Sequence, residues 1–199
     1  MDYFFEYGEK ELVHLRKKDK KLGVVIDNIG MIRRKINPNP ISALIESIVG
    51  QQISNKAAAT VCERLNDLSG MDAHRVHMLS LETIQSCGMS MRKAEYIKNI
   101  SEIAVSKRID FEDFQNRSDD EIIKILTTIK GVGVWTAEML LIFSLMRPNV
   151  VSYGDLAIRR GMMHLYQLNE LPKEKFMQYA KGYSPYGSVA SLYLWEMSH

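Results

Sequence analysis

The chain has 199 residues, 46% hydrophobic and 25% charged, which is enough apolar material for one large or two small globular domains. Its two cysteines, Cys62 and Cys87, are too few for a four-cysteine zinc or iron–sulfur site, and their wide spacing indicates a reduced protein. The net charge of +2 does not identify a nucleic-acid binder by itself. No apolar stretch approaches the ~20 residues that a bilayer requires, and the amino terminus lacks the regions of a secretory signal. We therefore expect a cytoplasmic protein with no membrane partner.

Helical periodicity dominates the chain from residue 39 onward and predicts an all-α fold. Asn39-Pro40 opens a helix that ends at Gly50, because proline is tolerated in a first turn, and Ser54 caps the next helix. The later helices are expected, in chain order, at Asn55–Leu65, Leu81–Cys87, Met91–Ser106, Glu121–Thr128, Val134–Met146, Asp155–Tyr166, Lys173–Lys181 and Ser188–Met197. Strands can lie only near residues 24–26 or 149–151, and both segments are too short to make a sheet by themselves.

The most informative run covers residues 126–143. A helix is followed by Ile129-Lys-Gly-Val-Gly133, and an apolar helix begins at once. Two glycines two positions apart allow a tight turn and a close approach to another surface. The amides that open the second helix lack partners within it and lie at the positive end of its dipole, so a phosphate can accept hydrogen bonds there. A bare pair of glycines also fits an ordinary corner between two helices, so only further residues can distinguish a phosphate site from such a corner.

Those residues follow about twenty positions later, where Gly154-Asp155-Leu156 places a carboxylate at the start of a helix. Three other segments complete an ordered set: Leu44–Ser54, Gly88–Lys98 and Pro185–Trp195. The whole set resembles the helix–hairpin–helix DNA glycosylase superfamily, and within it the AlkA-type 3-methyladenine DNA glycosylases. The resemblance spans about residues 40–197.

The resemblance implies two helical subdomains that flank a cleft, with the hairpin at about residues 121–146. The core would cover residues 36–199, and residues 1–35 would form a segment that packs on it. The larger AlkA proteins carry an N-terminal sheet domain, and with only about 35 residues before the core this chain looks like the compact form of the family.

The resemblance also assigns the chemistry of the site. Asp155 is implied as the catalytic residue, because its carboxylate can stabilise the cationic sugar that forms as the glycosidic bond breaks and can orient water. The same side chain can cap its own helix. Trp135, Met139 and Trp195 would line the base pocket, where a cationic alkylated purine gains attraction over an indole face. The alternative for both tryptophans is packing as core aromatics.

The contacts with DNA are assigned to two segments. Gly131, Gly133 and Thr136 would hold phosphate at the hairpin. Gln51 and Gln52 lie in the loop that enters DNA, since a flipped base leaves a gap that needs a plug. Gln52 is the better candidate for the plug, and either glutamine can instead brace the loop or cap a helix.

No cofactor is expected to be required. Hairpins of this family often hold a structural monovalent cation, Na or K, through main-chain oxygens, and by resemblance those oxygens belong here to Thr127, Ile129 and Val132. The family suggests a monomer that acts on double-stranded DNA with a damaged base. His74 and His77 are three apart but are expected in a loop with no third ligand nearby.

Bifunctional relatives carry a lysine nucleophile just after the hairpin, where this chain has Trp135, and Lys130 precedes the glycines. Gly154 stands where some members have a second acid, which argues against a two-carboxylate mechanism. The predicted function is therefore a monofunctional DNA glycosylase that hydrolyses the N-glycosidic bond of alkylated bases, such as 3-methyladenine, in base excision repair. Two alternatives stay open: a glycosylase for oxidised or deaminated bases, and a helix–hairpin–helix module that only binds DNA.

Overall fold

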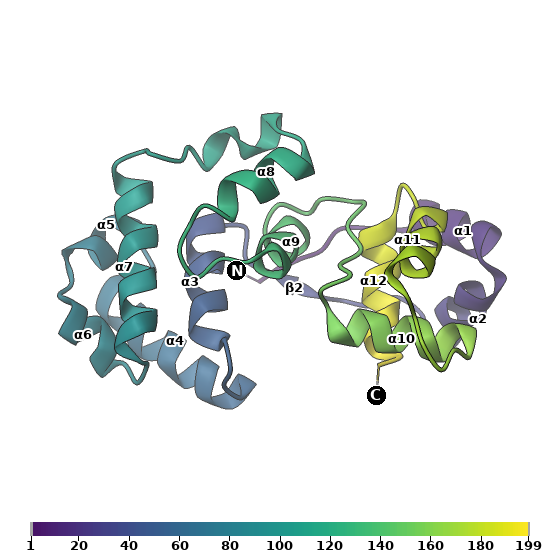
Figure 1. Ribbon diagram of the computed structural model, residues 1–199, viewed down its shortest axis with the longest axis horizontal. Helices are drawn as coiled ribbons and strands as arrows, with labels where there is room; N and C mark the ends of the chain where they lie inside the picture. Colours follow the sequence, from purple (N-terminus) through teal and green to yellow (C-terminus); the bar gives the residue numbers. More distant parts are fainter. Residues whose placement is uncertain (1, 199) are drawn as a thin grey trace. The chain divides into compact units, whose positions relative to one another are not determined.

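The computed structural model describes residues 2–198, and over this range its regular structure is mainly helical (Figure 1). The chain forms two compact units. The central unit consists of residues 37–140. The terminal unit combines the described residues up to Ile36 with those from Leu141 onward. Within residues 2–198, no helix is both long enough and apolar enough to span a bilayer.

The terminal unit contains a short antiparallel ribbon and five helices of its own. In chain order these elements are β1 (Tyr3–Phe4), α1 (Glu9–Lys18), α2 (Lys20–Ile29), β2 (Lys35–Ile36), α10 (Leu156–Tyr166), α11 (Lys173–Gly182) and α12 (Gly187–Glu196). Helix α12 is apolar on every side and is buried from Gly187 to Trp195, as expected for a helix at the centre of a unit.

Helix α10 crosses α12 at very short range, and Figure 1 shows the two helices in contact. Gly161 makes this possible, because a Cβ at that position would overlap the Leu194 carbonyl oxygen. Helix α2 packs on both α10 and α12 and buries Leu22 and Ile26 completely. Its N-cap, Asp19, accepts hydrogen bonds from the Leu22 amide at 2.9 Å and from the Tyr166 hydroxyl of α10.

The central unit contains the remaining helices. They are α3 (Pro40–Gly50), α4 (Asn55–Ser69), α5 (Ala73–Met78), α6 (Leu81–Ser86), α7 (Met91–Val105), the 3-10 helix η1 (Glu112–Asn116), α8 (Asp119–Leu126) and α9 (Val134–Phe143). Only the last residues of α9, from Leu141, belong to the terminal unit. Helix α7 packs on α3, α5 and α6, so it is the central element of this unit.

Side-chain caps set the helix starts where the sequence predicts them. Asn39 accepts from the amides of Ile41 and Ser42, both at 3.0 Å, with Pro40 in the first turn. Ser54 accepts from the Ala57 amide at 3.3 Å. The predicted Ser54 cap is confirmed, and so is the predicted helix start at Asn39-Pro40.

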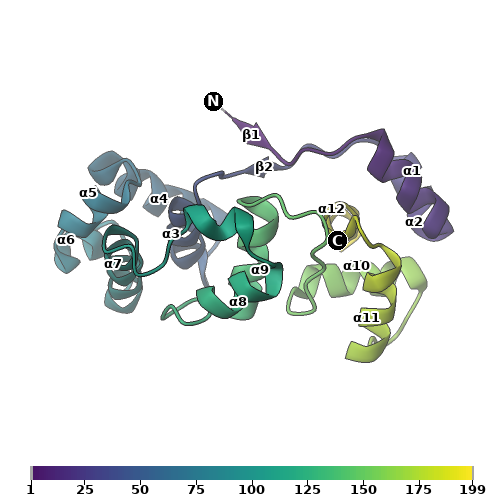
Figure 2. The same ribbon diagram turned by 90° about the horizontal axis from the view of Figure 1, so that it is seen from above.

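Several elements differ from the prediction. The two strands, β1 and β2 (Figure 2), lie at residues 3–4 and 35–36, and not near residues 24–26 or 149–151. Tyr3 of β1 pairs with Ile36 of β2. Residues 24–26 belong to α2, because Leu22 and Ile26, four apart, form an apolar face that favours a helix over a strand. His74 and His77 lie in helix α5 and not in a loop, since Asp72 caps this short helix through the Arg75 amide at 3.0 Å.

Candidate active site and hairpin

Asp155 is a buried carboxylate, 7% exposed, at the N-terminus of α10. Its Oδ1 atom accepts a hydrogen bond from the Ile158 amide at 2.9 Å and a second from the indole Nε1 of Trp195 at 3.2 Å. The first bond is the N-cap interaction that the sequence allows for this residue. Together the two donors, one from α10 and one from α12, hold the carboxylate in a single orientation.

Trp195 is 9% exposed, and it has other neighbours besides Asp155. Its ring packs on Phe143 with 5.2 Å between centroids and an interplanar angle of 34°. The Arg34 guanidinium lies 5.7 Å from each of these two ring centroids. The terminal unit therefore brings together a carboxylate, two aromatic rings and a cation. Phe143 and Arg34 have no local signal in the sequence, because an aromatic residue in an apolar helix and an arginine in a basic triplet are both common.

The hairpin between α8 and α9 lies in the central unit. The Ile129 carbonyl accepts from the Val132 amide at 3.0 Å, which closes the turn, and Gly131 has a φ of +89° that only glycine adopts readily. The Ala137 amide donates to the Gly133 carbonyl at 3.0 Å, so Gly133 is the N-cap of α9. The first amides of α9 therefore have no acceptor within the helix, which is the arrangement that binds phosphate elsewhere.

Gly133 keeps this helix end accessible. The residue is exposed, and a Cβ built on it would meet open space. Three predicted residues follow in α9: Trp135 is 43% exposed, Thr136 is buried and Met139 is half-buried. Trp135 and Met139 are four apart, so they share one face of the helix.

The two glutamines between α3 and α4 have different environments. The Gln51 side chain donates through Nε2 to the Gly131 carbonyl at 3.0 Å, which ties the loop to the hairpin. Gln52 is exposed and has a φ of +58°. The sequence offers both residues as candidates for the plug, whereas in the structure Gln51 is tied to the hairpin and Gln52 is exposed.

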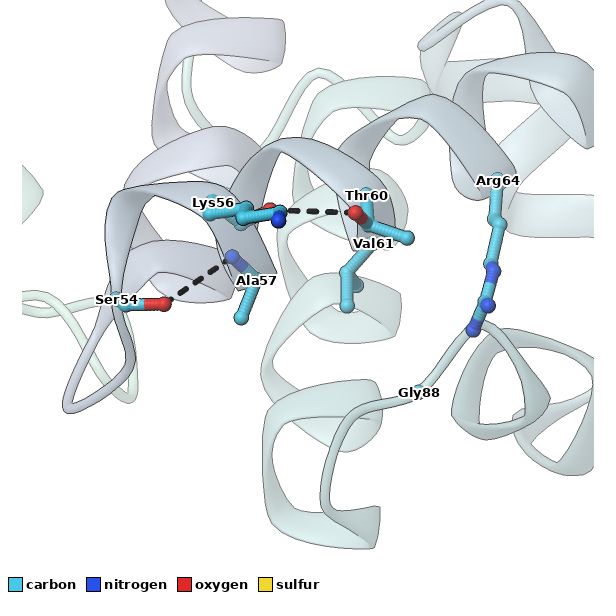
Figure 3. Close-up of a pocket in the computed structure, with 7 residues that line it drawn as sticks. All are labelled: Ser54, Lys56, Ala57, Thr60, Val61, Arg64 and Gly88. Carbon is cyan, nitrogen blue, oxygen red and sulfur yellow. Dashed lines mark hydrogen bonds between the residues drawn. The ribbon is translucent and has the colours of Figure 1, made fainter.

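A surface groove of about 400 Å³ runs along α4, next to this loop (Figure 3). Among the described residues that line it, Lys56 and Arg64 are charged, and Arg64 donates to the Cys87 carbonyl at 3.2 Å. None of the predicted base-pocket residues lines the groove.

Main-chain oxygens are the donors that the hairpin offers to a cation. The Thr127 hydroxyl turns back on α8 and donates to the Ile123 carbonyl at 2.8 Å, and the Thr128 hydroxyl donates to that of Ile125 at 2.7 Å. Carbonyl oxygens suit hard monovalent cations. In the described part of the chain, His, Cys, Asp and Glu side chains form no group of three or more that could hold a metal.

Comparisons with known proteins show which family has this sequence and fold. A family model described as HhH-GPD superfamily base excision DNA repair protein matches residues 45–185. The DNA-3-methyladenine glycosylase 1 of Schizosaccharomyces pombe is 33% identical over 198 residues, which cover 95% of this chain and 87% of that protein. The crystal structure of a Bacillus halodurans DNA-3-methyladenine glycosidase superposes with a TM-score of 0.85 at 35% identity, and covers 100% of this chain and 92% of the other. The S. pombe 3-methyladenine DNA glycosylase in complex with abasic DNA gives a TM-score of 0.80 at 32% identity, over 94% and 95% of the two chains.

A helix–hairpin–helix with an accessible helix N-terminus, followed by a buried carboxylate that caps the next helix, defines the class of DNA glycosylases that repair damaged bases. The chain belongs to the HhH-GPD superfamily of base excision DNA repair proteins. The predicted family and the predicted all-α helix–hairpin–helix glycosylase fold are thereby confirmed, and so is a DNA glycosylase acting in base excision repair.

Proposed function

We propose that this protein is a monofunctional glycosylase that removes alkylated bases, such as 3-methyladenine, from double-stranded DNA by hydrolysis. The observation that carries the proposal is the Asp155 carboxylate, buried and held by the Ile158 amide and the Trp195 indole, in a chain whose similar relatives are named 3-methyladenine glycosylases. A module that only bound DNA would have no need of such a carboxylate.

Asp155 stabilises the sugar from which the base departs. As the N-glycosidic bond breaks, positive charge develops on the sugar ring, and a fixed carboxylate lowers the energy of that state. An alkylated purine already carries a positive charge and leaves readily, so no second acid is needed, in keeping with Gly154 beside Asp155. Water, oriented by the same carboxylate, completes the hydrolysis.

Aromatic side chains bind the flipped base. Trp135, with 43% of its surface exposed, offers an indole face, and Met139 on the same side of α9 adds a polarisable thioether. Trp195 has a second task, since its indole N–H holds Asp155. Because position 135 carries tryptophan and not lysine, no imine forms there and the DNA strand is left uncut.

The hairpin and the loop after α3 hold the duplex. Gly131, Gly133 and Thr136 bring the amides at the start of α9 to a phosphate, and a Na or K ion on the carbonyls of Thr127, Ile129 and Val132 would brace this turn. Exposed Gln52 fills the gap left by the flipped base, while Gln51 braces the loop through the Gly131 carbonyl. The protein acts as a monomer, in the compartment that holds the DNA.

Release of free base from methylated duplex DNA tests the proposal. The purified protein should liberate 3-methyladenine, detected by liquid chromatography, and nothing from unmethylated duplex. A panel of duplexes with hypoxanthine or 8-oxoguanine serves as the comparison. Release from the oxidised or deaminated duplexes alone would favour the second glycosylase class, and binding with no release from any duplex would favour the non-catalytic module.

A further inference from the structure

Lys93 of α7 connects the two segments that are proposed to contact DNA. Its ammonium group donates to the Val49 carbonyl at 2.8 Å and to the Gln51 carbonyl at 2.6 Å. These carbonyls lie at the end of α3, where main-chain oxygens lack partners within the helix and where a cation is favoured by the helix dipole. Lys93 therefore closes α3 and sets the direction in which the chain leaves it, one residue before Gln52.

The contacts continue from the loop to the hairpin and return to α7. The Gln51 side chain donates to the Gly131 carbonyl at 3.0 Å. Gly131 packs so closely on the ring of Tyr96 that a Cβ at position 131 would overlap it. Tyr96 lies one helical turn after Lys93, and its hydroxyl accepts from Arg92 Nε at 2.6 Å. Helix α7 thus touches the loop through Lys93 and the hairpin through Tyr96.

The environment of Lys93 supports a fixed position. The side chain is half-buried, and burial lowers the pKa of its ammonium group below the usual lysine value. A partly desolvated ammonium needs strong acceptors, and the two carbonyls supply them. By contrast Gln52, the residue that the loop presents, is exposed and in the left-handed region of backbone space at φ +58°.

We propose that Lys93 is a positioning residue for base flipping. It holds the loop so that Gln52 enters the duplex at a fixed distance from the phosphate bound by the hairpin. The hydrogen bond from Gln51 to the Gly131 carbonyl keeps the loop and the hairpin at that distance. The inference rests on the proposed function, and it adds a residue that touches neither the base nor the sugar. Loss of Lys93 should impair flipping and excision while general attraction to DNA remains.

The chain supplies a matched control in Lys98, five residues further along α7. Its ammonium group also donates to two carbonyls, those of His77 and of Leu79, the latter at 2.6 Å, and it closes α5 as Lys93 closes α3. Neither carbonyl belongs to the loop or the hairpin. Lys93→Met and Lys98→Met therefore remove the same kind of contact, and only the first touches the DNA-binding segments.

The experiment measures single-turnover release of 3-methyladenine, the fluorescence of a 2-aminopurine next to the lesion as the signal of flipping, affinity for undamaged duplex, and thermal unfolding. Lys93→Met should slow release by about 10-fold or more and reduce the flipping signal, because small displacements of a positioning group are costly. Affinity for undamaged duplex should change less than about threefold, as phosphate contacts dominate it. Lys98→Met should release base at the wild-type rate, and Lys93→Arg should restore part of the loss.

If Lys93→Met does not fold at the assay temperature, Gln51→Leu removes the next link and should give the same loss of flipping. Equal slowing by Lys93→Met and Lys98→Met would overturn the proposal, since it would reduce Lys93 to a general stabiliser. A wild-type flipping signal in Lys93→Met would overturn it as well. Failure of the proposed function is distinct, because the wild-type protein itself would then release no 3-methyladenine.

Discussion

The Asp155 carboxylate combines a structural and a chemical task in one side chain. Its Oδ1 atom caps α10 and accepts from the Trp195 indole, and both bonds need only an oxygen acceptor. The proposed chemistry needs the negative charge as well. The two tasks can therefore be separated by a substitution that keeps the oxygen and removes the charge.

Asp155→Asn is that substitution. The amide oxygen can still accept from Ile158 and Trp195, so the thermal unfolding midpoint should stay near that of the wild type. Excision should fall by roughly 10²-fold or more, since the fixed charge that stabilises the cationic sugar is lost. Single-turnover base release measures the effect, and a near-normal rate in the variant would assign the chemistry to another residue.

Cys62 carries a prediction about pH. Burial, and then the nearby charge of Glu46, raise the pKa of its thiol to about 11 from the ordinary value of 9.0. Because the thiolate is the reactive form, iodoacetamide at pH 8 should modify Cys62 roughly 100-fold more slowly than an unfolded thiol. The pKa of the Cys62 thiol is higher in the folded chain than in the unfolded chain, so the protonated thiol favours the folded state. Its contribution to the free energy of unfolding is present below pH 9 and is lost as the pH rises from 9 to about 11.

Mass spectrometry after timed alkylation measures this rate, with protein in urea as the reference for the exposed thiol. Cys87→Ser removes the other cysteine and leaves a single site. Modification of folded Cys62 at the rate seen in urea would contradict the raised pKa.

Local residues of the site were predictable, and their partners were not. Asp155 could be placed because an acid that caps a helix and a hairpin twenty residues earlier are both short-range patterns. Trp195 lies 40 residues from Asp155 and Gln51 lies 80 residues from Gly131, so no periodicity links either pair. Lys93 likewise reads as an ordinary surface lysine until α3 and α7 are packed together.

Helix starts and ends show the same division between local and distant information. The helices that begin at residues 40, 55 and 91 were predicted to within a few residues, since Asn39, Ser54 and Ser90 sit immediately before apolar periodic runs and cap them. The prediction left residues 1–35 without assigned helices, although α1 and α2 lie there. Their apolar faces are short. They are stabilised by packing of α1 on α2 and of α2 on α10 and α12, which a local pattern cannot report.

The two glycines of the hairpin should respond differently to alanine. Gly131→Ala introduces a Cβ at a φ of +89° and against the Tyr96 ring, so it should destabilise the fold and weaken DNA binding together. Gly133→Ala meets open space, so it should lower the unfolding temperature only slightly, through the poorer N-cap, while it weakens binding to damaged and undamaged duplex alike.

Thermal unfolding and duplex affinity at several salt concentrations separate these effects. Binding should weaken as salt rises, because phosphate contacts release counterions. Lesion-selective loss in Gly133→Ala would argue against a phosphate contact at this helix end.

The close crossing of α10 and α12 in the terminal unit, at Gly161, gives a second prediction for the helices. Gly161→Ala should destabilise the protein by about 1–3 kcal/mol or more, because the new methyl group overlaps main-chain atoms of α12 that cannot rotate away. Urea unfolding measures the change. Gly182→Ala, at a helix position where a Cβ meets open space, is the control and should not lower stability.

At the scale of the whole molecule, the prediction concerns the DNA that the enzyme leaves behind. With Trp135 in place of a lysine, base loss should yield an intact abasic strand that breaks only in hot alkali. Borohydride should trap no covalent adduct between protein and DNA, as seen by gel electrophoresis. An adduct through Lys130 or any other lysine would show that the enzyme is bifunctional and would favour oxidised bases as substrates.

The division of the chain has a consequence for its synthesis on the ribosome. The central unit, residues 37–140, is continuous, so it can fold as soon as it leaves the exit tunnel. The terminal unit cannot, because α2, which can pack on α1 early, lacks its other partners until α10 and α12 have been made. For the time that roughly a hundred residues take to be added, Leu22 and Ile26 of α2 are without the α10 and α12 surfaces on which that helix later packs. Nascent chains stalled near residue 140 should therefore bind chaperones through their amino-terminal segment.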